Sequence, residues 1–199
     1  MTKNRPDGII ISWNNKRKGN HVSKKQDKRA HLLNAAIELL GSNDFDTLTL
    51  EAVAKQANVS KGGLLYHFPS KEALYAGITE LIFQDFVYRF NELAENDPIE
   101  KGKWTRALIH AYTDDLNNSQ VLNIASHSFS KLNPTVTENI LVHFEYIQSK
   151  IDEDGIDSVL ATTIRLTLDG LYYSEFFKLG QINFDLREKI IEKLIESTT

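Results

Sequence analysis

Three observations on the 199-residue sequence predict an all-α protein. Apolar residues follow spacings of three and four, which is the period of one face of an α-helix. Asn, Gly and Pro separate these periodic segments where helices are expected to stop. The strand pattern is weak even at its clearest, over Ile9–Trp13. An apolar content of 41% is enough for a hydrophobic core and too high for a disordered chain.

The periodic segments follow one another with short breaks. Thr49, Ser60 and Ser70 each stand where a side-chain oxygen can cap the helix that follows. Pro69 ends one segment, and Gly180 separates the last two. The expected helices cover residues 24–40, 50–56, 61–67, 70–94, 103–117, 119–131, 134–151, 157–180 and 184–197.

Residues 1–23 are polar and basic, and we expect them to form a flexible arm. Their one apolar stretch, Ile9–Ile11, is too short for the hydrophobic region of a signal peptide. No apolar run approaches the roughly 20 residues that a membrane-spanning helix needs. The chain has no cysteine, which excludes disulfides and thiolate metal sites. A cytoplasmic protein without a membrane partner is therefore expected.

Charge is distributed unevenly along the chain, although the net charge is only −4. Residues 1–71 carry 12 Lys and Arg against 6 Asp and Glu, whereas residues 72–199 carry 11 against 21. Such asymmetry favours a basic part that meets nucleic-acid phosphates and an acidic part that does not. The alternative is a solvated basic tail on an acidic domain.

The two short helices at 50–56 and 61–67 are joined by the tight turn Ala57–Val59, which is typical of a helix-turn-helix. The second helix of this motif can enter the major groove with its first residues at the base edges. Gly62 and Gly63 each cost a helix roughly 1 kcal/mol relative to alanine. Close approach to a DNA backbone would explain this cost, and close helix packing is the alternative.

The stretch from Thr49 to Leu74 reads TLEAVAKQANVSKGGLLYHFPSKEAL. It resembles the DNA-binding domain of the TetR family of bacterial regulators, and the resemblance extends over about residues 24–94. It implies a three-helix helix-turn-helix DNA-binding domain at 24–71, followed by a helical effector-binding and dimerisation domain at 72–199. Most such regulators are repressors that a small molecule releases from a double-stranded operator.

Motif position assigns the residues that would face DNA. Gly63 stands where the family usually has Thr or Ser, and Leu65 where it often has Tyr, so these two positions depart from the pattern. Tyr and His can also donate hydrogen bonds to phosphate oxygens. The expected DNA-facing residues are Thr49, Ser60, Lys61, Gly62, Gly63, Leu65, Tyr66, His67 and Lys71.

Aromatic and polar residues gather in the C-terminal part, as they do in pockets for small molecules. An ordinary aromatic core is the alternative explanation. The expected effector-binding residues are Trp104, His110, His127, Phe144, Tyr172, Tyr173 and Phe176.

The sequence offers no constellation typical of catalysis. Its six histidines are never spaced i, i+4, and it has no glycine-rich phosphate loop. Asp152–Asp154 is interpreted as a solvated acidic turn rather than a metal site. We therefore expect neither an enzyme nor a cofactor. A helical enzyme or carrier is the alternative class, and the acidic C-terminal part disfavours a non-specific nucleoid protein.

The last two helices are expected to form a homodimer. Apolar residues cover most of the circumference of helix 157–180, which therefore needs cover on most sides. Helix 184–197 is amphipathic, and the pair would complete a four-helix interface with a partner. Such a dimer would bind a palindromic operator. The expected interface residues are Leu160, Ile164, Leu168, Leu171, Ile191 and Leu194.

Overall fold

The computed structural model describes residues 24–42, 48–129 and 134–199, and regular structure in these ranges is entirely helical. The all-α prediction is thereby confirmed. The weak strand signal at Ile9–Trp13 and the basic arm lie outside the described residues. The helices are α2 (Lys24–Ser42), α3 (Leu50–Gln56), α4 (Lys61–His67), α5 (Lys71–Glu95), α6 (Lys103–Leu116), α7 (Ser119–Phe129), α8 (Pro134–Asp152), α9 (Ser158–Phe177) and α10 (Phe184–Glu196).

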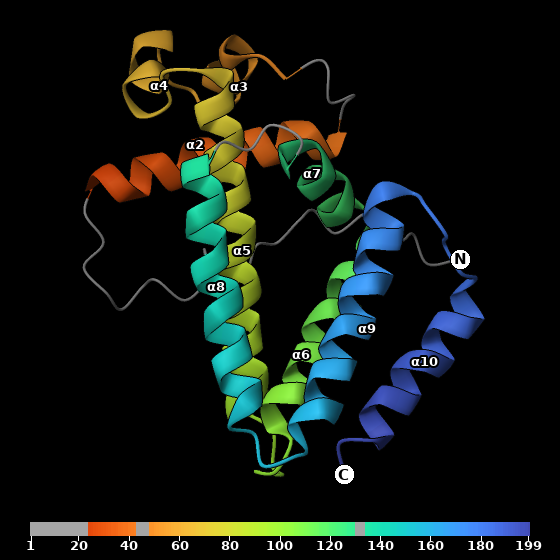
Figure 1. Cartoon of the computed structure of the whole chain (residues 1–199). Helices are drawn as coiled ribbons and strands as arrows, with labels where there is room; N and C mark the ends of the chain where they lie inside the picture. The colour runs from red at the N-terminus through yellow and green to blue at the C-terminus, as the bar shows by residue number, and fades with distance from the viewer. Residues whose placement is uncertain (1–23, 43–47, 130–133) are drawn as a thin grey trace, which may run out of the picture.

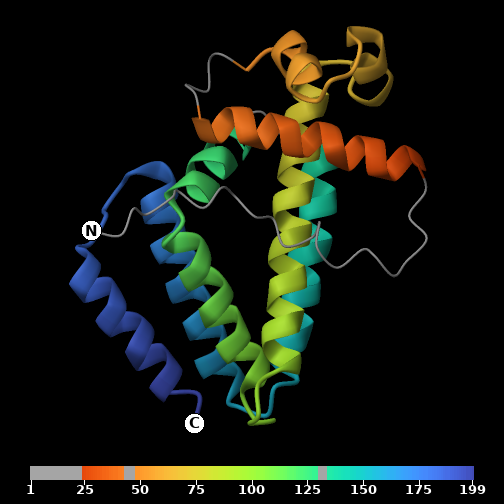
Figure 2. The ribbon, with the colours of Figure 1, turned by 180° about the vertical axis from the view of Figure 1, so that it is seen from behind.

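The long helix α5 is the axis of the molecule (Figure 1). Helices α3 and α4 lie at its N-terminal end, where α2 crosses it. Its C-terminal half lies beside α8 and leads into α6, which packs against α9. Helix α10 lies at the outer edge of this group, as the view from behind also shows (Figure 2).

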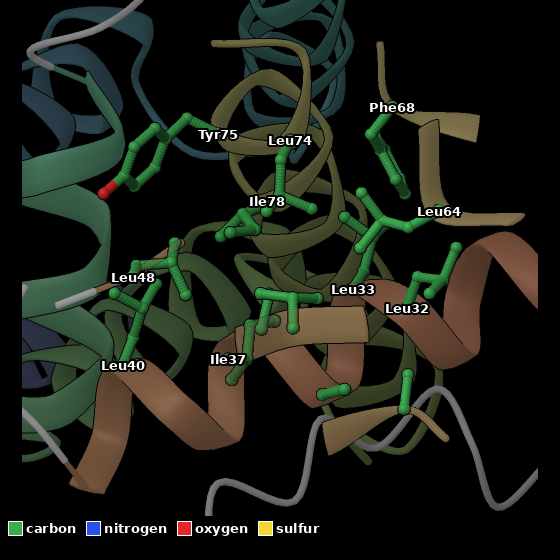
Figure 3. Packing of buried hydrophobic residues seen from close by; sticks show 14 of the residues in the cluster. Leu32, Leu33, Ile37, Leu40, Leu48, Leu64, Phe68, Leu74, Tyr75 and Ile78 are labelled. Atoms are coloured by element: carbon green, nitrogen blue, oxygen red, sulfur yellow. The ribbon is translucent and has the colours of Figure 1, made fainter. Parts of the chain in front are cut away.

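The first hydrophobic core holds α2, α3 and α4 against the N-terminal half of α5 (Figure 3). Leu33, Leu64, Phe68 and Ile78 each expose 2% or less of their surface. At Gly77 the helices cross so closely that a Cβ would lie 2.8 Å from Phe68 Cε1 and 3.0 Å from Leu33 Cδ2. The core therefore extends well into α5, beyond the boundary expected after residue 71.

Two polar contacts from α2 hold the helix-turn-helix in place. His31 Nε2 lies 2.9 Å from the carbonyl oxygen of Ala57, the first residue of the turn after α3. Arg29 Nη2 donates to Glu80 on α5 at 3.1 Å, and its guanidinium lies 5.1 Å from the centre of the Phe68 ring. These contacts fix the orientation of α3 and α4 relative to α5.

The second core joins α5, α6, α8, α9 and α10. Asp154, in the connection between α8 and α9, accepts hydrogen bonds from the backbone nitrogens of Trp104 at 3.0 Å and Thr105 at 2.6 Å. The aspartate is only 4% exposed and satisfies free N–H groups at the start of α6. The interpretation of Asp152–Asp154 as a solvated turn is thus wrong for Asp154.

The residues predicted to form the dimer interface lie toward the interior of the protomer itself. Ile164, Leu168 and Ile191 are 1%, 0% and 5% exposed, and they pack in the second core. Leu171 is buried there too, and Leu160 and Leu194 pack against the same cluster. Ile164, Leu168, Leu171 and Ile191 are corrected as interface residues, because they are buried within one protomer, where α6 packs against both α9 and α10. Leu160 and Leu194 are half-buried and stay predictions. The exposed apolar side chains in and just after α9 are those of Val159, Leu166, Tyr173, Phe177 and Leu179.

Within the described ranges, no helix combines the length and the apolarity needed to cross a bilayer.

Candidate DNA-binding surface and ligand cavity

Local capping sets the geometry of the helix-turn-helix. Thr49 Oγ1 accepts a hydrogen bond from Ala52 N at 3.1 Å, and Ser60 Oγ accepts one from Gly63 N at 3.1 Å. Between the two helices Asn58 has a left-handed φ of 53°, which asparagine tolerates better than most residues. The expected caps and turn are therefore confirmed.

The surface around the two glycines of α4 is open. A Cβ added at Gly62 would meet no atom within 4 Å, and one at Gly63 would come closest to Ser60 Oγ, at 3.3 Å. Helix packing therefore does not explain either glycine. The open surface suits close approach of another molecule's backbone.

Two lysines are expected to face DNA, and both have neighbours in the free protein. Lys61 Nζ lies 2.5 Å from Glu51 Oε1, and both side chains are exposed. The hydrogen bond and the charge of Lys61 lower the pKa of Glu51. Lys71 Nζ lies 5.8 Å from the centre of the Tyr75 ring. Lys61 would therefore exchange a carboxylate for a phosphate on binding DNA.

A groove runs between α2 and the helix-turn-helix. It brings together four of the expected residues: Ser60, Gly63, Tyr66 and His67. Tyr66 is 71% exposed and meets the His67 ring edge-to-face, with centroids 5.1 Å apart. The remaining expected residues, Thr49, Lys61, Gly62, Leu65 and Lys71, lie outside the groove wall.

Sequence reasoning missed three polar residues of this groove, Lys28, His31 and Asn58. Lys28 belongs to the basic run that opens α2, which was a usable signal. His31 carries no such signal, because only the fold brings it to the turn.

The helical domain contains a partly open cavity of about 440 Å³ between α5, α6, α7, α8 and α9. Phe144, Tyr172, Tyr173 and Phe176 of the expected effector-binding set line it. The other lining residues are Ile82, Phe83, Phe86, Tyr112, Asp115, Ala125, Ile147, Asp169 and Phe177.

Two expected effector-binding residues do not line the cavity, and this corrects their assignment. Trp104 packs against Phe90 in the second core, with ring centroids 5.2 Å apart. His110 is exposed on α6 and is absent from the cavity wall. The side chain of His127 lies outside the described residues.

The cavity wall is mostly aromatic. The Tyr112 ring meets Phe86 and Tyr172 edge-to-face, at centroid distances of 5.2 and 5.6 Å. Tyr172 stacks on Phe176 at 6.1 Å. These rings pack against one another and form a continuous aromatic cluster in the wall.

Two carboxylates interrupt this wall. Asp115 accepts a hydrogen bond from Arg89 Nη2 at 2.6 Å, and Asp169 accepts one from the Tyr112 hydroxyl at 2.5 Å. Burial raises the pKa of Asp115 to about 6, although the charge of Arg89 lowers it. Burial, and then the charge of Asp169, raises the pKa of Tyr112. Asp169 interrupts the apolar sequence of α9, and this signal could have identified it, whereas Asp115 follows Asp114 near the end of the mixed helix α6 and carries no such signal.

Helices α5 and α7 connect the cavity to the DNA-binding part. On α7, Ile124 is buried in the first core while its neighbour Ala125 lines the cavity. On α5, Ile82 packs against the first core and also lines the cavity. A molecule in the cavity would therefore touch residues directly joined to the helix-turn-helix support.

A capped helix-turn-helix at one end of a long helix, followed by a helical domain, is the architecture of a DNA-binding regulator. Residues 32–78 match the family model for bacterial regulatory proteins of the tetR family. Residues 102–199 match the model for the tetracyclin repressor-like C-terminal domain. The chain belongs to the TetR family of DNA-binding transcriptional regulators.

Individual proteins agree with this assignment. The nucleoid occlusion factor SlmA of Vibrio cholerae is 26% identical over 183 residues, which span 82% of this chain and 93% of that protein. The transcriptional regulator SCO7518 of Streptomyces coelicolor superposes with a TM-score of 0.62 at 16% identity, over 87% of this chain and 99% of that one. The fatty acid degradation regulator FadR of Bacillus halodurans gives 0.62 at 16% identity, over 86% and 96%.

Proposed function

We propose that this protein is a repressor whose binding to an operator is relieved by a small molecule in the cavity. The observation that carries the proposal is the pair Ile124 and Ala125, which places adjacent residues of α7 in the DNA-binding core and in the cavity wall. A ligand shifts a conformational equilibrium only through different affinities for the two states. Displacement of α7 by a ligand would give that difference.

The DNA contacts in this proposal follow from the exposed surface of α4 and its surroundings. Lys61 and Lys71 would bind phosphates, while Tyr66 and His67 would contact the sugar–phosphate backbone. Gly62 would allow the DNA backbone to approach the helix. Base readout would come from the first residues of α4, as in other helix-turn-helix proteins.

A homodimer is part of the proposal. The outward side of α9 carries Val159 and Leu166, which are 72% and 57% exposed, and Phe184 and Leu186 at the start of α10 are also exposed. Large apolar side chains left exposed in one protomer favour an interface with another molecule. Two copies would present two recognition helices to half-sites about one DNA turn apart, so the operator would be palindromic. We place this dimer in the cytoplasm.

Substitutions at the two adjacent α7 residues test the coupling. An operator is first selected from random duplexes, and a ligand is selected by its effect on binding measured by fluorescence anisotropy. Ala125→Leu should lower ligand affinity at least about tenfold by filling cavity space, and operator affinity without ligand should not change. Ile124→Val is the matched control, because that side chain faces the other core.

Two results would contradict the proposal. One is a ligand that occupies the cavity but leaves operator affinity unchanged. The other is an Ala125→Leu protein that still binds and responds normally.

Nucleoid occlusion is a second candidate function, favoured by the similarity to SlmA over 82% of this chain. Nucleoid occlusion would use the same DNA-binding surface, but DNA binding would not change the transcription of nearby genes. Chromatin immunoprecipitation with transcript profiling separates the two. A few sites whose nearby genes change on deletion would support a repressor, whereas many dispersed sites without transcript changes would support nucleoid occlusion.

A further inference from the structure

Among the described residues, those that line the cavity and carry a charge are all acidic. Asp115 and Asp169 line it, and none of the lining residues in the described part of the chain is Lys, Arg or His. Asp115 is 3% exposed, so bulk water does not screen its charge as it would at the surface. The chemistry of this wall therefore differs from that of a purely apolar cavity.

Each carboxylate of the wall pairs with an arginine behind it, and one of these arginines also faces carboxylates outside the wall. Arg89 donates to Asp85 at 3.0 Å and to Asp115 at 2.6 Å, and it also lies 3.9 Å from Asp114. Three carboxylates thus share one guanidinium. Arg165 pairs with Asp169 at 3.0 Å. The cluster behind the cavity keeps an excess of negative charge.

The aromatic residues add a second attraction for cations. Rings carry negative charge on their faces, and a cation within about 6 Å of a ring centre is attracted to it. Tyr172 and Phe176 stack with centroids 6.1 Å apart, while Tyr112 and Phe86 stand edge-to-face. A wall of this kind favours a positive charge carried on an apolar body.

We propose that the cavity binds an organic cation with an aromatic or branched apolar body, its charge beside Asp115 and Asp169 and its body among the rings. This inference rests on the proposed function and names the chemical class of its effector. An anion would meet two carboxylates and no lining cation. A neutral molecule of the same shape would gain only apolar burial.

Three probes with the same naphthylmethyl body test the charge preference by isothermal titration calorimetry on the full chain. They are naphthylmethyl-trimethylammonium, its neutral carbon isostere neopentylnaphthalene, and the anion naphthylacetate. We expect the cation to bind at least about tenfold tighter than the isostere, and the anion to bind most weakly. Equal or tighter binding of the isostere or the anion, or no binding of any probe, would overturn the inference.

Variants then assign the effect to the cavity. Asp169→Asn should weaken the cation about tenfold and leave the isostere within about twofold, because only the charge is lost. Glu145→Gln, at an exposed position of α8 next to Phe144, is the matched control and should change neither. Equal losses for cation and isostere in Asp169→Asn, or a loss in Glu145→Gln, would contradict the assignment.

A second substitution guards against misfolding of Asp169→Asn. Tyr173 is 48% exposed, so its replacement should leave the core intact. Tyr173→Leu should weaken the cation more than the isostere, whereas Tyr173→Phe should retain both affinities. If Tyr173→Leu and Tyr173→Phe retain the affinity for the cation equally well, the ring of Tyr173 has no role in binding the cation. Release of the operator is then measured with the probe that binds most tightly. If a neutral or anionic probe releases the operator, the preference for cations is wrong but the repressor function is supported.

Discussion

Gly62 is the second residue of the seven-residue helix α4, although nothing surrounds the position that its Cβ would occupy. Gly77 is the opposite case, because Phe68 and Leu33 leave no room for a Cβ there. Packing explains the second glycine and not the first. Gly77 is therefore required by the packing of the fold, and the open space at Gly62 fits the proposed approach of DNA.

Gly62→Ala should therefore stabilise the protein while weakening its function. Alanine favours a helix over glycine by about 1 kcal/mol, and thermal unfolding measures the gain. The added methyl would keep a DNA backbone away, so operator affinity should fall. A variant that is more stable and binds the operator as tightly as the parent would show that DNA does not approach this position.

The ion pair between Lys61 and Glu51 should limit DNA affinity. Glu51→Gln removes the competing carboxylate, so affinity should rise about two- to fivefold, the range for an exposed pair. Lys61→Ala should weaken binding to all sequences and lower the salt slope by about 1. Titrations at several salt concentrations measure both effects.

Glu38→Gln is the matched control for the Glu51 substitution. Glu38 is exposed and accepts a hydrogen bond from Gln56 on α3. Its replacement should leave DNA affinity unchanged. An unchanged salt slope in Lys61→Ala would remove that lysine from the interface.

At the scale of the element, the start of α6 depends on a residue 50 positions away in the sequence. Gly102 precedes the helix with a left-handed φ of 78° and has no side chain to cap it. Asp154 satisfies two backbone N–H groups of the first turn instead. The α8–α9 connection is thus held to the start of α6.

Asp154→Ala should destabilise the protein by about 2 kcal/mol, because two buried N–H groups lose their acceptor. Chemical denaturation measures the change. Asp152→Ala, two residues earlier at an exposed position, is the control and should cost much less. Equal effects of the two substitutions would show that the cap does not stabilise the fold.

Local signals explain which elements could be predicted. The bounds of α3 and α4 match the expected 50–56 and 61–67, because Thr49 and Ser60 cap their own helices. The acceptor role of Asp154 depends on a contact between distant segments, which periodicity does not report. The same limit applies to His110, whose type suggests a ligand site but whose side of α6 faces outward.

The arrangement of all the helices determines which side of each helix is buried, and the sequence of one helix does not show this. Helix α9 is apolar around most of its circumference, so its sequence does not distinguish the side that meets α6 from the side that would meet a partner. The fold makes this distinction: Leu168 is fully buried, whereas Leu166 is 57% exposed. The fold therefore moves the predicted interface from Leu168 to the exposed side of α9, and the dimer itself stays a prediction.

The dimer prediction can now be tested on the outward side of α9. Val159 and Leu166 are seven residues apart, so they lie on the same side of the helix. Replacing both with Glu should give a folded monomer at micromolar concentration, measured by sedimentation velocity. Operator affinity should fall steeply, because the two half-sites would no longer be bound by one linked molecule.

Two further variants make the dimer test specific. Leu141→Glu changes an apolar side chain that is 52% exposed on α8, away from the proposed interface, and should leave the dimer intact. Leu168→Glu would place a charge in the protomer core, so it should unfold the protein rather than yield a folded monomer. A Val159→Glu, Leu166→Glu protein that sediments as a dimer would place the interface elsewhere. A dimer lost equally in Leu141→Glu would show that α8 takes part in it.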